Sequence, residues 1–356
     1  MGYRADAAFA RYREQRVFGS LDGLRCLAIV PVVLHHSISG EVTGLLSKGP
    51  LGVDLFFALS GFLITTLLLR ERARQGRVDT IAFYRRRARR IFPLYYLVLG
   101  LYALRALLLL PLGPQRSHFF ASLPFFATYT TNWFVDFSAP HPIIFAFSWS
   151  LAAEEQFYAV FPWLYRFRAG PWLGAVALLA LDVAGEQGAL AAWGASTLAV
   201  RMASSVQAAI CFGALLACVL HTPRGFRAVY ALLGGRGSVL VPFVALGLAL
   251  VLPGVPLWAT QMVLAVCVGA VVLREDHVLA PVLRQRHIAR IGAVSYGVYM
   301  LHVTAVTAVK RTLPDPWRSL PVVFGLSLVL SVLAAEISFR FFESRWSSRR
   351  QDPSVA

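Results

Sequence analysis

The sequence predicts an all-α protein, a polytopic bundle of about ten transmembrane helices. Of its 356 residues, 57% are hydrophobic and only 15% are charged, whereas soluble domains carry about 25% charged residues. The apolar residues lie in runs of about 17–25, the length that crosses a bilayer. The arginines gather between these runs, as they do in cytoplasmic loops. These observations exclude an ordinary soluble domain, and they account for the net charge of +16 without a nucleic-acid partner.

Each apolar run is long enough to span the membrane as a helix. The predicted spans lie near residues 21–39, 51–69, 91–112, 150–166, 171–191, 197–220, 237–253, 256–273, 291–309 and 319–341. With both termini in the cytoplasm, most Lys and Arg residues fall in cytoplasmic segments, as the positive-inside rule requires. The polar tails, 1–20 and 342–356, are too short to fold alone, so we expect one domain over 1–356.

The stretch 113–148 belongs to none of these spans. It is aromatic ("FFASLPFFATYTTNWF"), but the charges agree with the topology only if it returns to the side on which it starts. Its Trp and Tyr side chains suit the membrane–water interface. We therefore expect an external loop with a re-entrant or interfacial part.

The first run, "LDGLRCLAIVPVVLHH" at 21–36, carries ionisable side chains that are costly inside a bilayer. On a helix, Arg25 and His36 lie about 20° from one line, and Asp22 lies about 40° from His36. His35 is rotated off this face, so we favour His36 of the two histidines. Two interpretations stay open. Either Asp22 and Arg25 pair at the membrane boundary and His36 caps a loop, or the three line one polar cavity.

The second run, "GVDLFFALSGFLIT", contains two small residues in its middle, Ser60 and Gly61. The simplest interpretation is that both allow another helix to pack closely. Asp54 lies one turn into the run from its external end, where it would face either the protein or a loop.

An arginine cluster precedes the third run in "FYRRRARRIFPLYYL". Such a cluster can bind anionic lipid head groups and fix the topology. It can also clamp phosphates, because guanidinium forks match phosphate oxygens in pairs. Arg87 and Arg90 are three residues apart and share a helix face, with Arg86 beside them. The composition does not separate the two interpretations.

Two adjacent acids, Glu154 and Glu155, follow Trp149 in "SWSLAAEEQFY", at the expected external membrane boundary. If Ser150 caps this helix, the acids lie in or just past its first turn, where they complement the helix dipole. Alternatively, one of them orients a histidine or acts as a second acid or base.

Five stretches, taken in order along the chain, resemble the membrane acyltransferase-3 family of integral-membrane O-acyltransferases. They are "LDGLRCLAIVPVVLHH", "GVDLFFALSGFLIT", "FYRRRARRIFPLYYL", "SWSLAAEEQFY" and "SYGVYMLH". The middle part of the chain, about 167–290, is similar only in hydropathy. Two positions depart from the family pattern, since Pro31 lies within the first helix and Glu343 is followed by Ser instead of Pro.

The resemblance implies roles for individual residues. His36 would be the essential base and Glu154 a catalytic acid residue. The acyl donor would bind to arginines, namely Arg25, Arg86, Arg87 and Arg90. Supporting positions would be Asp22, Ser60, Trp149, Glu155, Tyr296, Tyr299 and His302.

The resemblance also implies the reaction. An acyl group, most simply acetyl, would pass from a cytoplasmic acyl-CoA to a hydroxyl of a sugar, a cell-surface glycan or a secreted small molecule. Acetyl-CoA would be a co-substrate, and we expect no permanently bound cofactor and no metal. The cysteines lie inside apolar runs without metal-ligand spacing. We expect a multi-pass protein of the bacterial cytoplasmic membrane, and the alternative is a transporter or flippase that performs no acyl transfer.

Overall fold

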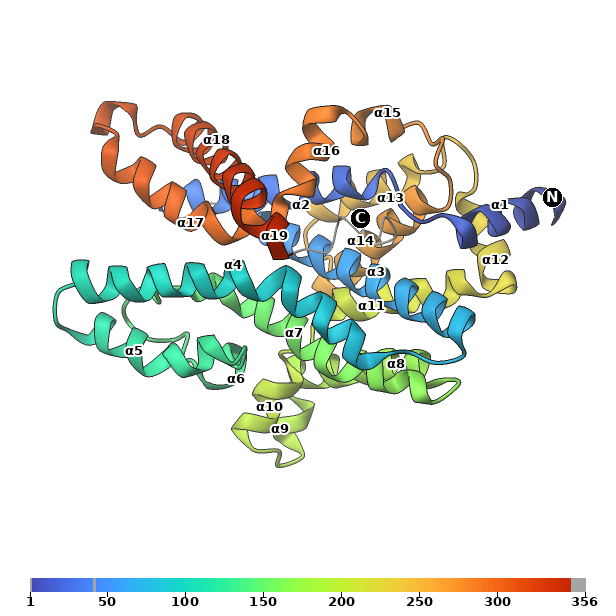
Figure 1. Ribbon diagram of the computed structural model, residues 1–356, viewed down its shortest axis with the longest axis horizontal. Coiled ribbons are helices and arrows are strands. Elements are labelled where there is room, and N and C mark those ends of the chain that lie inside the picture. The colour runs from blue at the N-terminus through green and yellow to red at the C-terminus, as the bar shows by residue number, and fades with distance from the viewer. Residues whose placement is uncertain (1, 41–42, 347–356) are drawn as a thin grey trace.

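The computed structural model describes residues 2–40 and 43–346 of the chain. Every regular element within these two ranges is a helix (Figure 1), which confirms the all-α prediction. The outer part of the predicted C-terminal tail, 347–356, lies outside the described residues.

The longest helices are α3 (Leu51–Gln75), α4 (Thr80–Leu109) and α18 (Leu320–Ser338), and short helices lie between them and after them. The first group is α1 (Gly2–Glu14), α2 (Leu21–Ser37), η1 (Gly44–Lys48), α3 (Leu51–Gln75), α4 (Thr80–Leu109), α5 (Pro114–Ala127), α6 (Thr131–Phe134), η2 (Ala146–Ser148), α7 (Trp149–Val160) and η3 (Phe161–Arg166). The second group is α8 (Gly170–Glu186), α9 (Ala189–Ala192), α10 (Thr197–Ala203), α11 (Ala208–His221), α12 (Pro223–Leu233), α13 (Leu240–Val251) and α14 (Leu257–Val272). The last group is α15 (Ala280–Leu283), α16 (Arg286–Ala293), α17 (Ser295–Thr312), η4 (Asp315–Trp317), α18 (Leu320–Ser338), the π-helix η5 (Phe339–Glu343) and α19 (Ser344–Trp346).

Among the described residues, three helical segments are long and apolar enough to cross a membrane. The number rises to five if each of two bent helix pairs is counted as one span. The three are Gly44–Gln75, Thr80–Leu109 and Leu320–Trp346. The bent pairs are α10 with α11, at 45°, and α16 with α17, at 77°. The count of about ten spans and the cytoplasmic position of both termini stay predictions.

The segment 113–148, expected to be an external loop, contains helical pieces. Its longest piece, α5, lies against α4, as Figure 1 shows for the left side of the molecule. The hydroxyl of Tyr95 donates to the carbonyl of Phe126 at 2.7 Å, and the hydroxyl of Tyr96 donates to that of Ala127 at 2.8 Å. The turn after α5 is thus fixed to α4, while its side of the membrane stays a prediction.

The N-terminal segment, predicted to be a polar tail, contains a helix that packs on the rest of the protein. Its helix α1 packs on α12, with the rings of Phe9 and Phe226 5.2 Å apart. Arg70 of α3 donates to the carbonyls of Tyr12 and Gln15, both at 2.6 Å. Arg70 is buried and closes the carbonyl end of α1, whose last carbonyls have no partners within the helix.

Helices α3 and α11 pack closely against each other in the centre of the bundle (Figure 1). A Cβ added to Gly61 would lie 2.0 Å from the carbonyl oxygen of Ile210. A Cβ added to Gly213 would lie 2.1 Å from the carbonyl oxygen of Ala58. Each helix therefore presents a glycine to the backbone of the other, as small residues do at membrane helix interfaces. The packing interpretation of Gly61 is confirmed.

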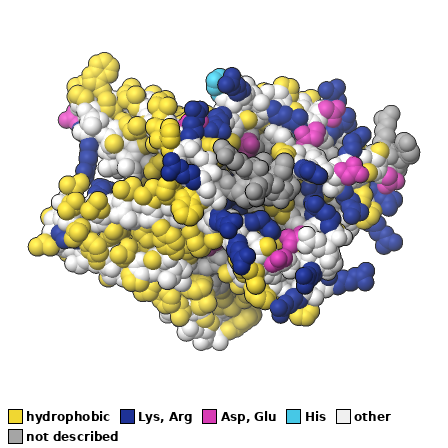
Figure 2. Space-filling model, viewed as in Figure 1, with side chains coloured by type: hydrophobic (Ala, Val, Ile, Leu, Met, Phe, Trp, Pro, Cys, Tyr) yellow, Lys and Arg dark blue, Asp and Glu magenta, His cyan; other side chains and the backbone are white. Residues whose placement is uncertain are grey.

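The charged and apolar side chains separate along the long axis of the molecule. Figure 2 shows Lys and Arg gathered over the half that carries α1 and α12. Hydrophobic side chains cover most of the other half, around α5 and the end of α4. This separation matches the clustering of arginines in the sequence.

Candidate functional site

A cavity of about 490 Å³ lies along α3. Its wall follows α3 from Val53 to Gln75, a rise of about 33 Å at 1.5 Å per residue. The hydrocarbon core of a bilayer is about 30 Å thick, so the cavity is long enough to cross much of it. Most of the predicted site residues line it, namely Asp22, Arg25, Ser60, Arg86, Arg87, Arg90, Glu154, Glu155, Tyr296 and Tyr299.

The two acids of α7 lie in the middle of this cavity, against Arg87 of α4. Ser60 donates to Oε1 of Glu154 at 2.7 Å. Nη2 of Arg87 lies 3.7 Å from Oε2 of Glu154, and its Nε lies 4.0 Å from Oε1 of Glu155. Arg87 also stacks on the ring of Tyr158 at 3.9 Å. Ser60 thus belongs to the polar site, whereas its neighbour Gly61 belongs to the helix packing.

This contact corrects the predicted depth of the acids. The sequence predicts Glu154 and Glu155 at the external boundary and the arginine clusters in cytoplasmic segments, yet the structure brings Arg87 against both acids. The reason is that residues 150–166 do not form one full span. They form the short helix α7 and then the 3₁₀ turn η3, and the residues just before α7 are already buried. Ser148, not Ser150, occupies the N-cap position of α7.

The ionisable residues at the start of α2 form an ion pair on the cavity wall. Nη1 of Arg25 lies 2.5 Å from Oδ1 of Asp22. Asp22 and Arg25 therefore pair with each other and also line the cavity. Arg25 uses one N–H group in this pair, and a guanidinium group has five.

His36 does not line the cavity, so the prediction of one lining face with Arg25 was wrong for this residue. The wall ends instead at Tyr299 and Ser150. The hydroxyl of Tyr299 donates to the carbonyl of Phe147 at 2.9 Å and lies 2.6 Å from the hydroxyl of Ser150. A position on a helix wheel shows which way a side chain points, but the neighbouring helices decide where a cavity closes.

Three histidines gather beyond this end of the cavity. The ring of His36 lies 4.6 Å from that of His302 and 5.3 Å from that of His35, both edge to face. Nδ1 of His36 lies 3.0 Å from the carbonyl of Val32. A carbonyl only accepts, so Nδ1 carries a proton, and in the neutral imidazole Nε2 then keeps a lone pair. The same argument applies to buried His302, whose Nδ1 lies 2.5 Å from the carbonyl of Tyr299.

The other predicted residues take different positions. Arg86 is 44% exposed and lies 3.3 Å from Glu71. The hydroxyl of Tyr296 donates to the carbonyl of Ile91 at 2.7 Å, which joins α17 to α4. Trp149 lies outside the cavity wall and packs edge to face on Phe57, with the ring centres 6.0 Å apart.

Two residues of the site were missed in the sequence. Tyr158 lies four residues after Glu154, so helical spacing already puts both on one face of α7. Glu71 lies on the cavity wall next to Arg86, but nothing in its local sequence distinguishes it from a surface acid.

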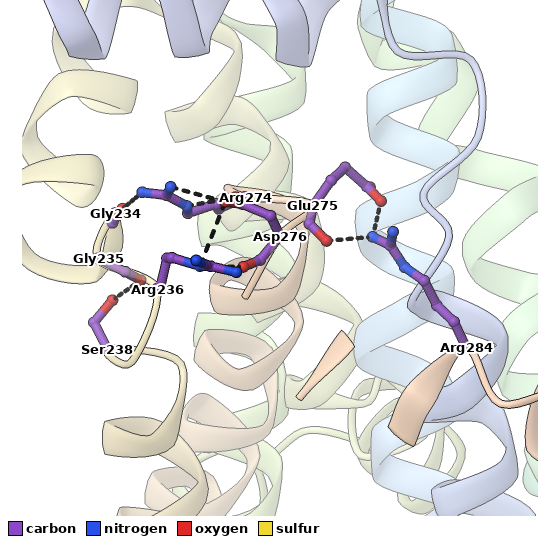
Figure 3. Close-up of polar contacts among 8 residues, drawn as sticks. All are labelled: Gly234, Gly235, Arg236, Ser238, Arg274, Glu275, Asp276 and Arg284. Atoms are coloured by element: carbon purple, nitrogen blue, oxygen red, sulfur yellow. Dashed lines mark hydrogen bonds and ion pairs between the residues drawn. The ribbon is translucent and has the colours of Figure 1, made fainter. Parts of the chain in front are cut away.

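A polar network holds the chain at one end of the cavity, where Arg16, Val17 and Phe18 form part of the wall. Figure 3 shows its core, in which the segments 234–238 and 274–276 meet. Nε of Arg284 donates to the hydroxyl of Ser20 at 3.2 Å, and Arg284 also contacts Glu275. These contacts fix the connection between α1 and α2.

Within the same network, Arg274 donates to Asp276 through Nε, at 2.5 Å, and through Nη2, at 2.9 Å (Figure 3). This hydrogen-bonded cation holds the pKa of the Asp276 carboxyl below its usual value. Arg236 adds a second cation 3.5 Å from the same carboxylate. The loop after α14 is therefore tied to the turn before α13 by charge-assisted contacts.

The chain is similar to known bacterial enzymes. It is 29% identical to the peptidoglycan O-acetyltransferase OatA of Listeria monocytogenes, over 94% of this chain and 56% of that protein. It is 25% identical to the O-acetyltransferase OatA of Staphylococcus aureus, over 92% of this chain and 57% of that protein. The chain thus spans about half the length of these relatives. No solved structure matches it significantly.

A family model described as an acyltransferase domain matches residues 18–337. This match covers α2 to α18 and includes every residue of the cavity wall that the motifs identified, from Asp22 to Tyr299. Together with the two relatives, it establishes that the chain belongs to the membrane acyltransferase-3 family, as its motifs indicated.

Proposed function

We propose that this chain is an O-acetyltransferase of the bacterial cytoplasmic membrane that moves an acetyl group from a cytoplasmic acyl-CoA to a glycan hydroxyl. The family and the relatives support transfer of acetyl groups to oxygen. The observation that carries the proposal is the cavity along α3. Its wall carries several arginines and apolar side chains, and it ends at Tyr299, which lies one helical turn from His302.

The arginines of the cavity suit the phosphates of the donor. Arg25, Arg86 and Arg90 lie on its wall together with Arg16, Arg70 and Arg74. Arginine binds phosphate oxygens through paired N–H groups. The acyl-bearing arm would then extend along α3, past apolar side chains such as Phe57 and Leu151.

The spacing along α2 favours transfer near His36. Eleven residues separate Arg25 from His36, which is about 16 Å along the helix axis. An extended pantetheine arm is of similar length, so phosphates held near Arg25 would bring the thioester toward the histidine cluster. Tyr299 and Ser150 separate the cavity from this cluster, and the acetyl group would pass them to react.

The chemistry requires a base and a route for the proton. Nε2 of His36 would take the proton of the acceptor hydroxyl while the hydroxyl oxygen bonds to the thioester carbon. The carbon–sulfur bond then breaks, and the thiolate of CoA takes the proton from His36. The hydrogen bond from Nδ1 to the Val32 carbonyl favours the neutral tautomer in which Nε2 carries the lone pair.

The test is acetyl transfer by the purified protein in detergent, with labelled acetyl-CoA and a soluble peptidoglycan fragment as acceptor. We expect acceptor-dependent release of CoA from the wild type. His36→Ala should reduce it to the uncatalysed rate, whereas His35→Ala should retain measurable transfer. Equal losses in both variants would overturn the assignment of the base. Movement of the glycan across the membrane of vesicles that contain the protein, without release of CoA, would overturn the proposal of acyl transfer.

A further inference from the structure

The end of α2 that carries His36 is weakly held by its own backbone. Pro31 interrupts α2 less than two turns before its end, and a proline has no N–H group to donate to the preceding turn. The last carbonyls of a helix have no partner within it. After Ser37 the chain leaves the helix, with Ile38 in an extended conformation. The last turn of α2 therefore depends on contacts from other elements.

Lys310, near the end of α17, supplies such a contact. Its Nζ donates to the carbonyl of His36 at 3.3 Å and to the carbonyl of Ile38 at 3.0 Å. A cation at this place also faces the negative end of the α2 dipole. The predicted topology puts Lys310 on the external side, where positive charges are disfavoured. The topology therefore gives no reason for a lysine here, whereas the two carbonyls do.

The two helices that Lys310 joins are the ones that carry the paired histidine rings. His302 lies eight residues before Lys310 on α17, about 12 Å along the helix axis. Its ring is buried, lies 4.6 Å from the ring of His36, and is held through Nδ1 by the carbonyl of Tyr299. The bond to the carbonyl of Val32 fixes the ring of His36 relative to α2. Lys310 in turn fixes the end of α2 relative to α17.

We propose that Lys310 is a positioning residue for the proposed base. By holding the carbonyl end of α2, it keeps Nε2 of His36 where the acceptor hydroxyl loses its proton. Lys310 itself exchanges no proton with the substrate. A misplacement of about 1 Å at a reacting group can cost about 100-fold in rate, so the contact has a measurable kinetic effect. The inference rests on the proposed function and adds a residue from α17 to it.

The test compares kinetic constants of the purified protein in detergent. Lys310→Met removes the ammonium group and keeps an unbranched side chain, and kcat should fall about 10- to 100-fold. The KM for acetyl-CoA should stay close to the wild-type value, because the arginines of the cavity lie away from this end of α2. Lys310→Arg keeps the charge and offers five N–H groups, so it should recover most of the lost rate.

Arg311→Met is the matched control. Arg311 is exposed and lies about 100° around α17 from Lys310, so this variant loses one positive charge from the same turn and should retain the wild-type kcat. Hydrogen exchange tests the contact without the reaction. Exchange at residues 34–38 should become faster in Lys310→Met and stay unchanged in Arg311→Met.

Four results would overturn the proposal. They are a wild-type kcat in Lys310→Met, a higher KM for acetyl-CoA without a loss of kcat, an equal loss of kcat in Arg311→Met, and no recovery in Lys310→Arg. Equal exchange at 34–38 in the wild type and Lys310→Met would overturn it as well. Absence of acetyl transfer by the wild type would instead refute the proposed function, on which the role of Lys310 depends.

Discussion

Replacing Arg87 with methionine should destabilise the protein far more than the same change at Arg86. Methionine keeps the length of the side chain but removes its charge. Arg87 forms ion pairs with both Glu154 and Glu155 inside the cavity. Arg86 is 44% exposed and pairs with Glu71 at 3.3 Å.

The burial of the two arginines sets the magnitudes. Breaking a buried ion pair by removing one partner costs about 3–5 kcal/mol, because the remaining charge stays buried without compensation. An exposed pair contributes about 0–1 kcal/mol. We therefore expect Arg87→Met to lower the free energy of unfolding by about 3–5 kcal/mol and Arg86→Met by less than about 1 kcal/mol.

The assay is reversible unfolding in mixed micelles with increasing denaturing detergent, followed by tryptophan fluorescence. The double variant Arg87→Met/Glu154→Gln should recover part of the loss, since it removes one of the uncompensated charges. Equal effects of Arg87→Met and Arg86→Met would refute the reasoning, and so would a double variant that is no more stable than Arg87→Met.

Three further predictions follow from the packing and the polar contacts. Gly61→Val should cost about 3 kcal/mol or more, because its side chain meets a backbone carbonyl, whereas Gly100→Val, in open space, should cost less than about 1 kcal/mol in the same unfolding assay. Arg70→Met removes two hydrogen bonds to the end of α1, so hydrogen exchange should become faster in α1 and stay unchanged in α11; equal exchange in both proteins would contradict the capping role. At saturating donor, Glu154→Gln should lower turnover more than Glu155→Gln, because Glu154 accepts from Ser60; full turnover in Glu154→Gln would leave that carboxylate a purely structural role.

Composition predicted the all-α fold because a bilayer allows few alternatives to helices. It did not predict where the helices break. The run 291–309 reads as continuous in hydropathy, yet α16 and α17 meet at a 77° bend. Apolar residues are equally acceptable in a straight helix and in a bent one, so hydropathy does not distinguish them.

The candidate site, like the fold, was predicted only in part from the sequence. Motif order identified most residues of the cavity wall, and helix geometry placed Asp22 and Arg25 correctly on one face. The contact between Arg87 and Glu154 joins residues far apart in the chain, and no local pattern encodes it. Ser60 and Gly61 illustrate the limit most simply. Both are small and adjacent, and only the neighbouring helices show that one binds a carboxylate and the other admits a backbone.

The glycine contacts between α3 and α11 have a consequence for measuring motion in this protein. Two helices whose backbones touch at Gly61 and Gly213 cannot slide by even one residue, about 1.5 Å, without collision. The distance between them can therefore serve as a fixed reference. Spin labels on α3 and α11 should keep one sharp distance throughout turnover. Distances from this pair to labels on α4 or α17 would then report how the cavity changes in width during the reaction.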